Sequence, residues 1–123
     1  MGLVIAVFIG GVLGAPARYL VDRFIKERFG ATMPWGTLAV NVLGSAILGL
    51  FMGLASNGRI PHAVLSLIGT GFCGALTTFS TFSADTFKLI EAGSANKAWG
   101  NVLLNLIIGM AILSLGYLIG GAF

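Results

Sequence analysis

The sequence has few charged residues and a single cysteine. Only 9% of its 123 residues are charged, whereas 57% are hydrophobic and the mean hydropathy is +0.99. Soluble domains carry a charge on roughly a quarter of their residues, so this composition excludes an ordinary soluble domain and indicates a membrane protein. One cysteine, Cys73, excludes both an internal disulfide and a multi-cysteine metal site.

The basic residues are also sparse, and they never form a run. A nucleic-acid-binding surface is therefore not expected, and we interpret these residues as the flanks of membrane spans. Six of the seven lie on one side of the predicted membrane and only Arg59 lies on the other. The six are Arg18, Arg23, Lys26, Arg28, Lys88 and Lys97. The positive-inside rule then favours one orientation, with both termini outside.

Four apolar stretches are each long enough to cross a bilayer as a helix. They make residues 1–123 a single four-span membrane domain, with no separate soluble domain expected. A signal peptide is disfavoured because basic residues follow the first apolar stretch and do not precede it. Residues 22–33 predict a loop or a short interfacial helix. The expected spans cover about 3–20, 35–55, 62–90 and 98–121.

Small residues recur at a spacing of four in the first two spans. Gly10 and Gly14 share one face of the first helix, and Ser45, Gly49 and Gly53 share one face of the second. Such a series lets two membrane helices approach closely. We therefore expect both faces to be helix-packing surfaces.

A polar, glycine-rich stretch at residues 69–85 interrupts the third span. Its glycines weaken a helix by about 1 kcal/mol each, and Thr77 and Thr78 restore little helical propensity. A break near 74–78 is expected, and Gly74→Val should crowd the turn more than Cys73→Leu. Carbonyl oxygens exposed at such a break are a usual way to hold a small cation.

The other candidate residues of the spans are neutral. Asn41 has two interpretations of equal weight: it bonds a neighbouring helix, or it donates to a permeating anion. Phe79 and Phe82 are neighbours on one helix face, and taken alone they are better explained by core packing. Asn101 and Asn105 share one face of the fourth span.

The kinds of charge that other transport mechanisms need are missing from the middle of the spans. A conduit for a large or multivalent anion uses rings of Arg or Lys, and a proton-coupled exporter needs a mid-membrane carboxylate. Asp85, near the end of the third span, is the closest candidate. Amides, hydroxyls and the positively polarised edges of aromatic rings can instead face a small anion without trapping it.

Three motifs together resemble the Fluc (CrcB-type) family of fluoride channels. They are the GGVLGAPARY sequence at residues 10–19, the WGTLAVN sequence at 35–41 and the GFCGALTTFSTFS sequence at 71–83. The last is specific, because few other four-span chains would carry it. The resemblance implies a channel and not an enzyme, in a prokaryotic plasma membrane. It also implies an antiparallel, dual-topology dimer with two fluoride pathways and a structural sodium ion between the subunits.

Residue roles follow from the same resemblance. The backbone carbonyls of Gly74 and Thr77 would bind the sodium ion. Ala75 and Cys73 replace residues usual in the family, but both are small, so the break should survive. The roles of Asn101 and Asn105 are less defined, because relatives often hold other residue types there. The residues implied for the fluoride pathway are Asn41, Phe79, Phe82, Ser80, Thr81 and Asn105.

Two alternatives to a fluoride channel stay open. A small dual-topology multidrug exporter would need a membrane-embedded Glu in the first span, which is missing. A non-conducting membrane scaffold would make Phe79 and Phe82 replaceable by leucine. The charge asymmetry also leaves two assemblies, because an antiparallel homodimer needs both orientations. The second is a heterodimer with an oppositely oriented paralogue.

Overall fold

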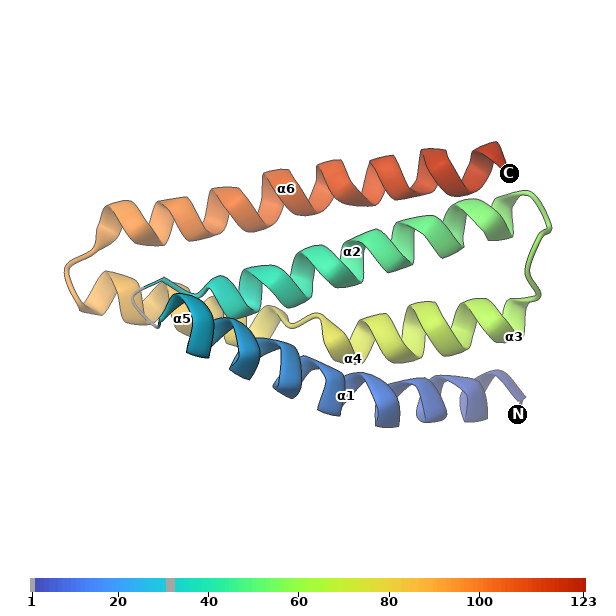
Figure 1. The fold of residues 1–123 in the computed structure, drawn as a ribbon, viewed down its shortest axis with the longest axis horizontal. Helices are drawn as coiled ribbons and strands as arrows, with labels where there is room; N and C mark the ends of the chain where they lie inside the picture. Colours follow the sequence, from blue (N-terminus) through green and yellow to red (C-terminus); the bar gives the residue numbers. More distant parts are fainter. Residues whose placement is uncertain (1, 31–32) are drawn as a thin grey trace.

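The computed structural model describes residues 2–30 and 33–123. In this part of the chain it is all-α, and four long helical segments lie side by side (Figure 1). Each segment is long and apolar enough to cross a membrane, which confirms the predicted four-span, multi-pass fold. The elements are α1 (Gly2–Phe29), α2 (Trp35–Ser56), α3 (His62–Leu65), η1 (Ser66–Cys73), α4 (Gly74–Leu76), α5 (Phe79–Glu91) and α6 (Ala95–Ala122).

The third span is broken, as the sequence predicts. Helical backbone runs through α3, a π-helical stretch η1 and α4, and it stops at Thr77. Thr77 and Thr78 are extended, with φ, ψ of −75°, 156° and −148°, 122°. The chain becomes helical again at Phe79, because the Thr78 hydroxyl caps α5 by accepting a hydrogen bond from the Thr81 N–H at 3.1 Å.

The glycines of this stretch have a different role from the one expected. Gly74 is helical, with φ −62°, and a Cβ atom added there would meet nothing within 4 Å. The expectation that Gly74→Val crowds the turn is therefore wrong within this chain. Gly71 is buried against α1, where its Cα lies opposite Gly10. A methyl group at either position would collide with backbone, so these two glycines set the approach of α1 to η1.

A second close contact joins α2 to α6. Gly49 and Gly53 face the backbone of α6 at Leu113 and Tyr117, and Gly116 and Gly120 face the backbone of α2. These reciprocal contacts confirm the predicted packing face of the second span. The contacts of Gly10 and Gly14 with the backbone of the third span confirm that of the first. Small residues allow both pairs of helices to pack through their backbones.

The first helix continues beyond the apolar stretch. Residues 22–29 are a helical extension of α1 and not a loop, and two ion pairs of spacing i, i+4 lie along it. Lys26 pairs with Asp22 at 3.0 Å, and Arg23 pairs with Glu27 at 3.1 Å. The polar segment therefore lengthens the helix instead of ending it.

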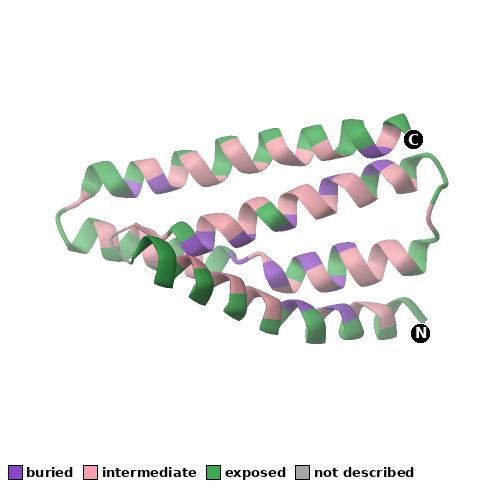
Figure 2. Cartoon of the chain, viewed as in Figure 1, coloured by how far each residue is buried: buried purple, intermediate pink, exposed green. Residues whose placement is uncertain are grey.

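The buried residues are few and lie between the helices (Figure 2). Large apolar side chains cover much of the outer surface, for example Phe8 at 72% exposed and Leu118 at 68%. In a membrane protein such a surface faces lipid or another subunit, because lipid tails solvate it as well as a protein core does. The bundle interior is correspondingly small and is built largely around Val40, Cys73, Leu76 and Ala98.

A neutral groove at the break in the third span

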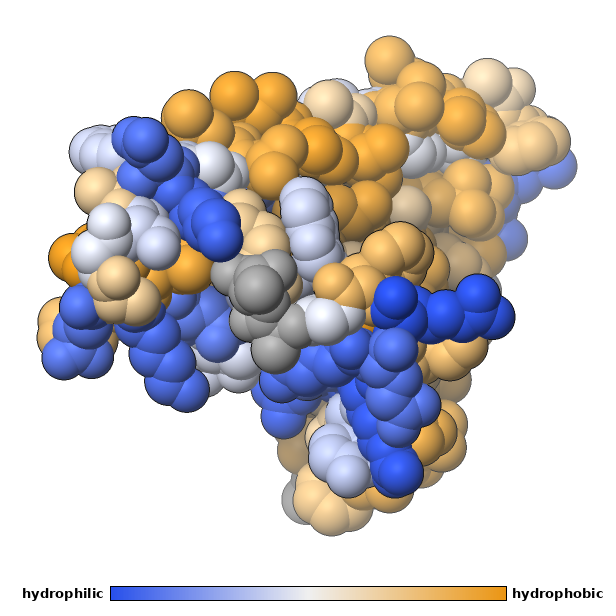
Figure 3. Space-filling model, turned by 60° about the vertical axis from the view of Figure 1, so that its left-hand side comes forward, coloured by the Kyte–Doolittle hydropathy of each residue, from blue (hydrophilic) through white to orange (hydrophobic). Residues whose placement is uncertain are grey.

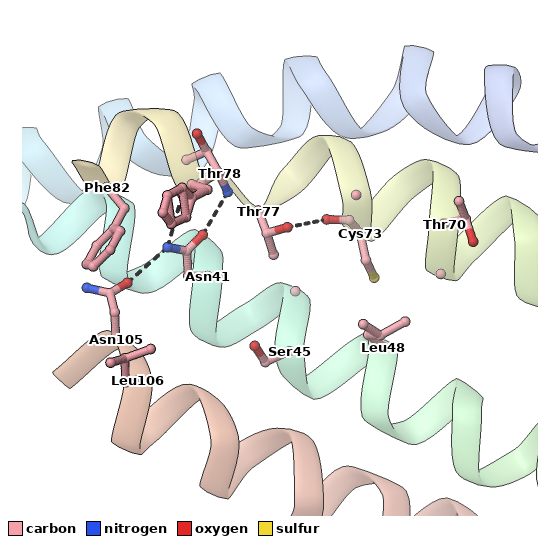
Figure 4. A pocket seen from close by; sticks show the side chains of 14 residues that line it. Asn41, Ser45, Leu48, Thr70, Cys73, Thr77, Thr78, Phe82, Asn105 and Leu106 are labelled. Carbon is pink, nitrogen blue, oxygen red and sulfur yellow. Dashed lines mark hydrogen bonds between the residues drawn. The ribbon is translucent and has the colours of Figure 1, made fainter. Parts of the chain in front are cut away.

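An open groove of about 600 Å³ lies between α2, the broken third span and α6. Asn41 and Ser45 enter it from α2, Asn105 enters from α6, and Thr77 comes from the break (Figure 4). Within the described part of the chain, none of the residues that line it is charged. The groove thus combines neutral hydrogen-bonding groups with apolar side chains at membrane depth.

Asn41 connects the groove to the break. Its Oδ1 accepts the Thr78 N–H at 2.8 Å, and its Nδ2 donates to Asn105 Oδ1 at 2.9 Å (Figure 4). A longer contact of 3.4 Å joins Nδ2 to the Thr78 carbonyl. The structure therefore shows the helix-bonding role of Asn41, one of its two predicted interpretations. Its role as an anion donor stays a prediction.

A chain of hydrogen bonds extends from Asn105 to the other half of the third span. Asn105 Nδ2 donates to both oxygens of Asn101, at 2.8 and 3.0 Å. Asn101 Nδ2 donates to the Thr86 hydroxyl at 2.9 Å, and that hydroxyl donates to the Phe82 carbonyl at 2.8 Å. Asn101 is 1% exposed, so this network fixes α5 against α6 in the bundle interior.

Among the backbone carbonyls that the break frees are those of Gly74 and Thr77. In a continuous helix they would accept the N–H groups of Thr78 and Thr81. Thr78 instead donates to Asn41, and Thr81 donates to the Thr78 hydroxyl. Both residues line the groove. Their oxygens are therefore available to a cation, a partner subunit or water.

Phe79 and Phe82 lie together at the edge of the groove. Their ring centroids are 5.8 Å apart at an interplanar angle of 61°, so the edge of one ring faces the other. Phe79 is 74% exposed and Phe82 is partly buried. Packing within the subunit therefore does not account for Phe79, since most of its surface is left uncovered.

The six residues predicted for the fluoride pathway are not all brought together. Asn41, Asn105, Phe79 and Phe82 line the groove. Ser80 and Thr81 lie on the first turn of α5 and do not line it. The Ser80 hydroxyl is 3.4 Å from that of Thr78, and Thr81 contributes its N–H to the cap.

One polar pair between the second and third spans was not predicted from the sequence. The Thr37 hydroxyl donates to Asp85 Oδ2 at 2.8 Å, and Thr37 is 3% exposed. Thr37 and Asn41 are four residues apart on α2, so the same helix face contacts the break at Thr78 and the following helix at Asp85. That spacing places Thr37 on the same face as Asn41, but it does not identify Asp85 as the partner of Thr37.

Comparisons with known proteins identify the family of this chain. The family model described as CrcB-like protein, Camphor Resistance (CrcB), matches residues 5–117. The chain is 50% identical to "Fluoride-specific ion channel FluC 1" of Nocardia farcinica over 99 residues, which is 80% of this chain and 67% of that protein.

Two further relatives match more of their own length. "Fluoride-specific ion channel FluC 1" of Streptomyces avermitilis is 48% identical over 105 residues, which is 85% of this chain and 84% of that protein. "Fluoride-specific ion channel FluC" of Shewanella loihica is 41% identical over 116 residues, 94% of each chain. Because both the family model and these relatives span most of the sequence, the chain belongs to the CrcB-like family.

Proposed function

We propose that this protein is a fluoride-selective ion channel of the cell membrane that vents cytoplasmic fluoride and so protects the cell from it. The observation that carries the proposal is the groove at the helix break, whose polar lining is neutral. A fixed cation at that depth would hold an anion tightly, whereas amides and ring edges bind it weakly enough to release it. The names of the relatives identify fluoride as the ion that those proteins conduct.

The proposed pathway uses groups that are already hydrogen-bonded in the structure. The contact between Asn41 Nδ2 and the Thr78 carbonyl is long, at 3.4 Å, and therefore weak. An arriving fluoride can replace it. The ring edges of Phe79 and Phe82 supply partial positive charge beside the amides of Asn41 and Asn105. Ser80 and Thr81 extend the polar track along the first turn of α5.

We propose that the functional unit is an antiparallel dimer. One side of the groove is open, and the exposed ring of Phe79 stands at its edge. A second subunit would close the groove and shield it from lipid. The homodimer is the simpler assembly, and a heterodimer with an oppositely oriented paralogue is its alternative, because the basic residues lie mainly at one end.

A structural sodium ion is proposed at the centre of the dimer. The Gly74 and Thr77 carbonyls have lost their helical donors, and a two-fold axis would bring two copies of each together. Neutral oxygens suit a hard monovalent cation, and its charge would favour anions nearby. Replacing sodium by a large organic cation on both sides of the membrane should therefore weaken the dimer. Unchanged dimerisation and flux would remove the sodium ion from the proposal.

The two alternative functions receive less support from the same geometry. An exporter needs a carboxylate free to exchange protons in the membrane, whereas Asp85 is held by the Thr37 hydroxyl. A non-conducting scaffold would not require a neutral polar groove or the aromatic ring of Phe79, which is 74% exposed.

The cellular role is tested by fluoride sensitivity. Hydrogen fluoride crosses a membrane uncharged and dissociates inside, so a cell accumulates fluoride unless a channel releases it. A host that lacks its own fluoride channel should grow in fluoride when it carries this protein. The Asn41→Asp variant, produced at the same level, is the matched control and should give no protection. Equal growth with both proteins would contradict the proposed role.

A further inference from the structure

A second recess, of about 400 Å³, lies at the end of the bundle that carries most of the basic residues. Three lysines from three different elements line it: Lys26 from α1, Lys88 from α5 and Lys97 from α6. Ser94, the residue before α6, and Asp85 complete its polar lining. Residues far apart in the sequence thus bring positive charge to one place.

Both acidic residues near this recess have a polar partner, but only Asp22 has its charge balanced by a lysine. Asp22 pairs with Lys26 at 3.0 Å, and Asp85 accepts the Thr37 hydroxyl. Among residues 2–30 and 33–123, no ion pair is formed by Lys88 or Lys97. The start of α6 adds partial positive charge, since the Ser94 side chain makes no capping hydrogen bond there. Because Lys26 is paired with Asp22, the charges of Lys88 and Lys97 outweigh the one charge of Asp85, and the recess keeps a net positive charge that suits an anion.

The basic recess lies where the membrane surface is expected. Hydrophilic side chains gather at this end of the molecule and apolar ones cover the adjoining part of the bundle (Figure 3). Trp35 and Trp99, near the starts of α2 and α6, are 38% and 68% exposed. Tryptophan at such a boundary is typical of the headgroup layer. An occupant of the recess would thus lie at headgroup depth.

An apolar recess of about 330 Å³ is bounded by the same two helices, α5 and α6. Ile90, Ala98, Trp99 and Val102 line it. The two recesses share no lining residue, but the same end of the bundle offers both a basic and an apolar surface, the two kinds of surface that a phospholipid contacts.

We propose that Lys88 and Lys97, together with the start of α6, bind the phosphate of an anionic phospholipid headgroup. Basic pockets between membrane helices bind such headgroups through charge and hydrogen bonds. The lipid would fix the α5–α6 connection at the membrane surface. This site is separate from the groove at the helix break, and the proposal does not depend on which ion that groove conducts.

The test measures lipid retention by the full-length protein. Purified protein in neutral phosphatidylcholine nanodiscs is titrated with phosphatidylglycerol, and bound lipid is counted by native mass spectrometry. In the Lys88→Gln/Lys97→Gln double variant, the affinity for phosphatidylglycerol should fall by roughly tenfold or more, since each surface lysine contributes to anionic lipid binding. The matched control, Arg23→Gln/Arg28→Gln, removes two charges from the same end outside the recess, so it should retain the lipid as the parent does.

Three results would overturn the proposal. One is equal retention of phosphatidylglycerol and added phosphatidylcholine by the parent protein. Another is an equal loss of bound phosphatidylglycerol in the lysine double variant and in the Arg23→Gln/Arg28→Gln control, which would show that only the net charge of this end matters. The third is full displacement of the lipid by a modest excess of inorganic phosphate, which would assign the site to a soluble anion. Lys88→Arg/Lys97→Arg serves as the folding control and should restore binding.

Discussion

Asn41 Oδ1 accepts the backbone N–H of Thr78 at 2.8 Å, so a side chain of α2 takes the place of the carbonyl that would continue the helix of the third span. The break is thus held from outside, by a residue of the neighbouring helix. The same side chain uses its Nδ2 to bond Asn105 across the groove. One residue therefore stabilises the break and presents a donor to the groove.

Asn41→Asp separates these two roles. Aspartate keeps the oxygen that accepts from Thr78, but it replaces the donor with a negative charge in a low-dielectric groove. We expect fluoride flux to fall at least a hundredfold while the helix content and the dimer are retained. Flux from liposomes and circular dichroism measure the two effects. A variant that still conducts fluoride at the parent rate would contradict the pathway role of Asn41.

Phe79→Ile and Phe82→Ile test the aromatic edges. Isoleucine keeps much of the apolar bulk and removes the ring quadrupole, so each variant should lose most of its fluoride flux without losing the dimer. Phe87→Ile is the matched control, because Phe87 lies on the same helix, is 59% exposed and does not line the groove. If both groove variants conduct fluoride at the parent rate, the two rings serve only for packing and not for anion contact.

Gly71 and Gly74 should respond differently to substitution. Gly71→Ala places a methyl group against the backbone of Val7 and Gly10, which should destabilise the subunit by about 1–3 kcal/mol. A Cβ atom at position 74 meets nothing within 4 Å in the subunit, so Gly74→Val should destabilise the subunit less than Gly71→Ala and should act mainly on the dimer. Thermal unfolding and cross-linking yield report the two effects. Equal loss of subunit stability in both variants would contradict this assignment of the two glycines.

Asn101→Leu tests the buried end of the hydrogen-bond chain. It removes the partner of Thr86 and one acceptor of Asn105, and polar groups left unsatisfied in this way cost about 1–3 kcal/mol each. We expect lower thermal stability in detergent, with fluoride selectivity retained by the protein that remains folded. Unchanged stability would show that the network does not fix α5 against α6.

The fold was predictable because its signals are local. Apolar runs of membrane length identify four spans, and small residues such as Gly10 and Gly49 identify the packing faces. The break in the third span was also predictable from composition, but its cause was not. Gly71 packs against the first helix, whereas the helix ends at Thr77 and Thr78. The position of this end depends on Asn41, which is 37 residues from Thr78.

The site was predictable in part for the same reason. Asn41 and Phe82 belong to motifs that can be read in sequence, and both line the groove. The bond between Thr37 and Asp85 joins residues 48 positions apart, and no periodicity within one helix reveals such a pair. The interior position of Asn101 likewise depends on how α6 packs against α5.

Ion efflux from liposomes tests the central proposal most directly. Purified protein is reconstituted in liposomes loaded with equal fluoride and chloride, a potassium ionophore balances the charge, and both anions are measured outside. The neutral lining of the groove predicts rapid release of fluoride with chloride retained, and no release of either anion from liposomes that contain Asn41→Asp. Release of chloride as readily as fluoride, or of neither anion by the parent protein, would contradict the account.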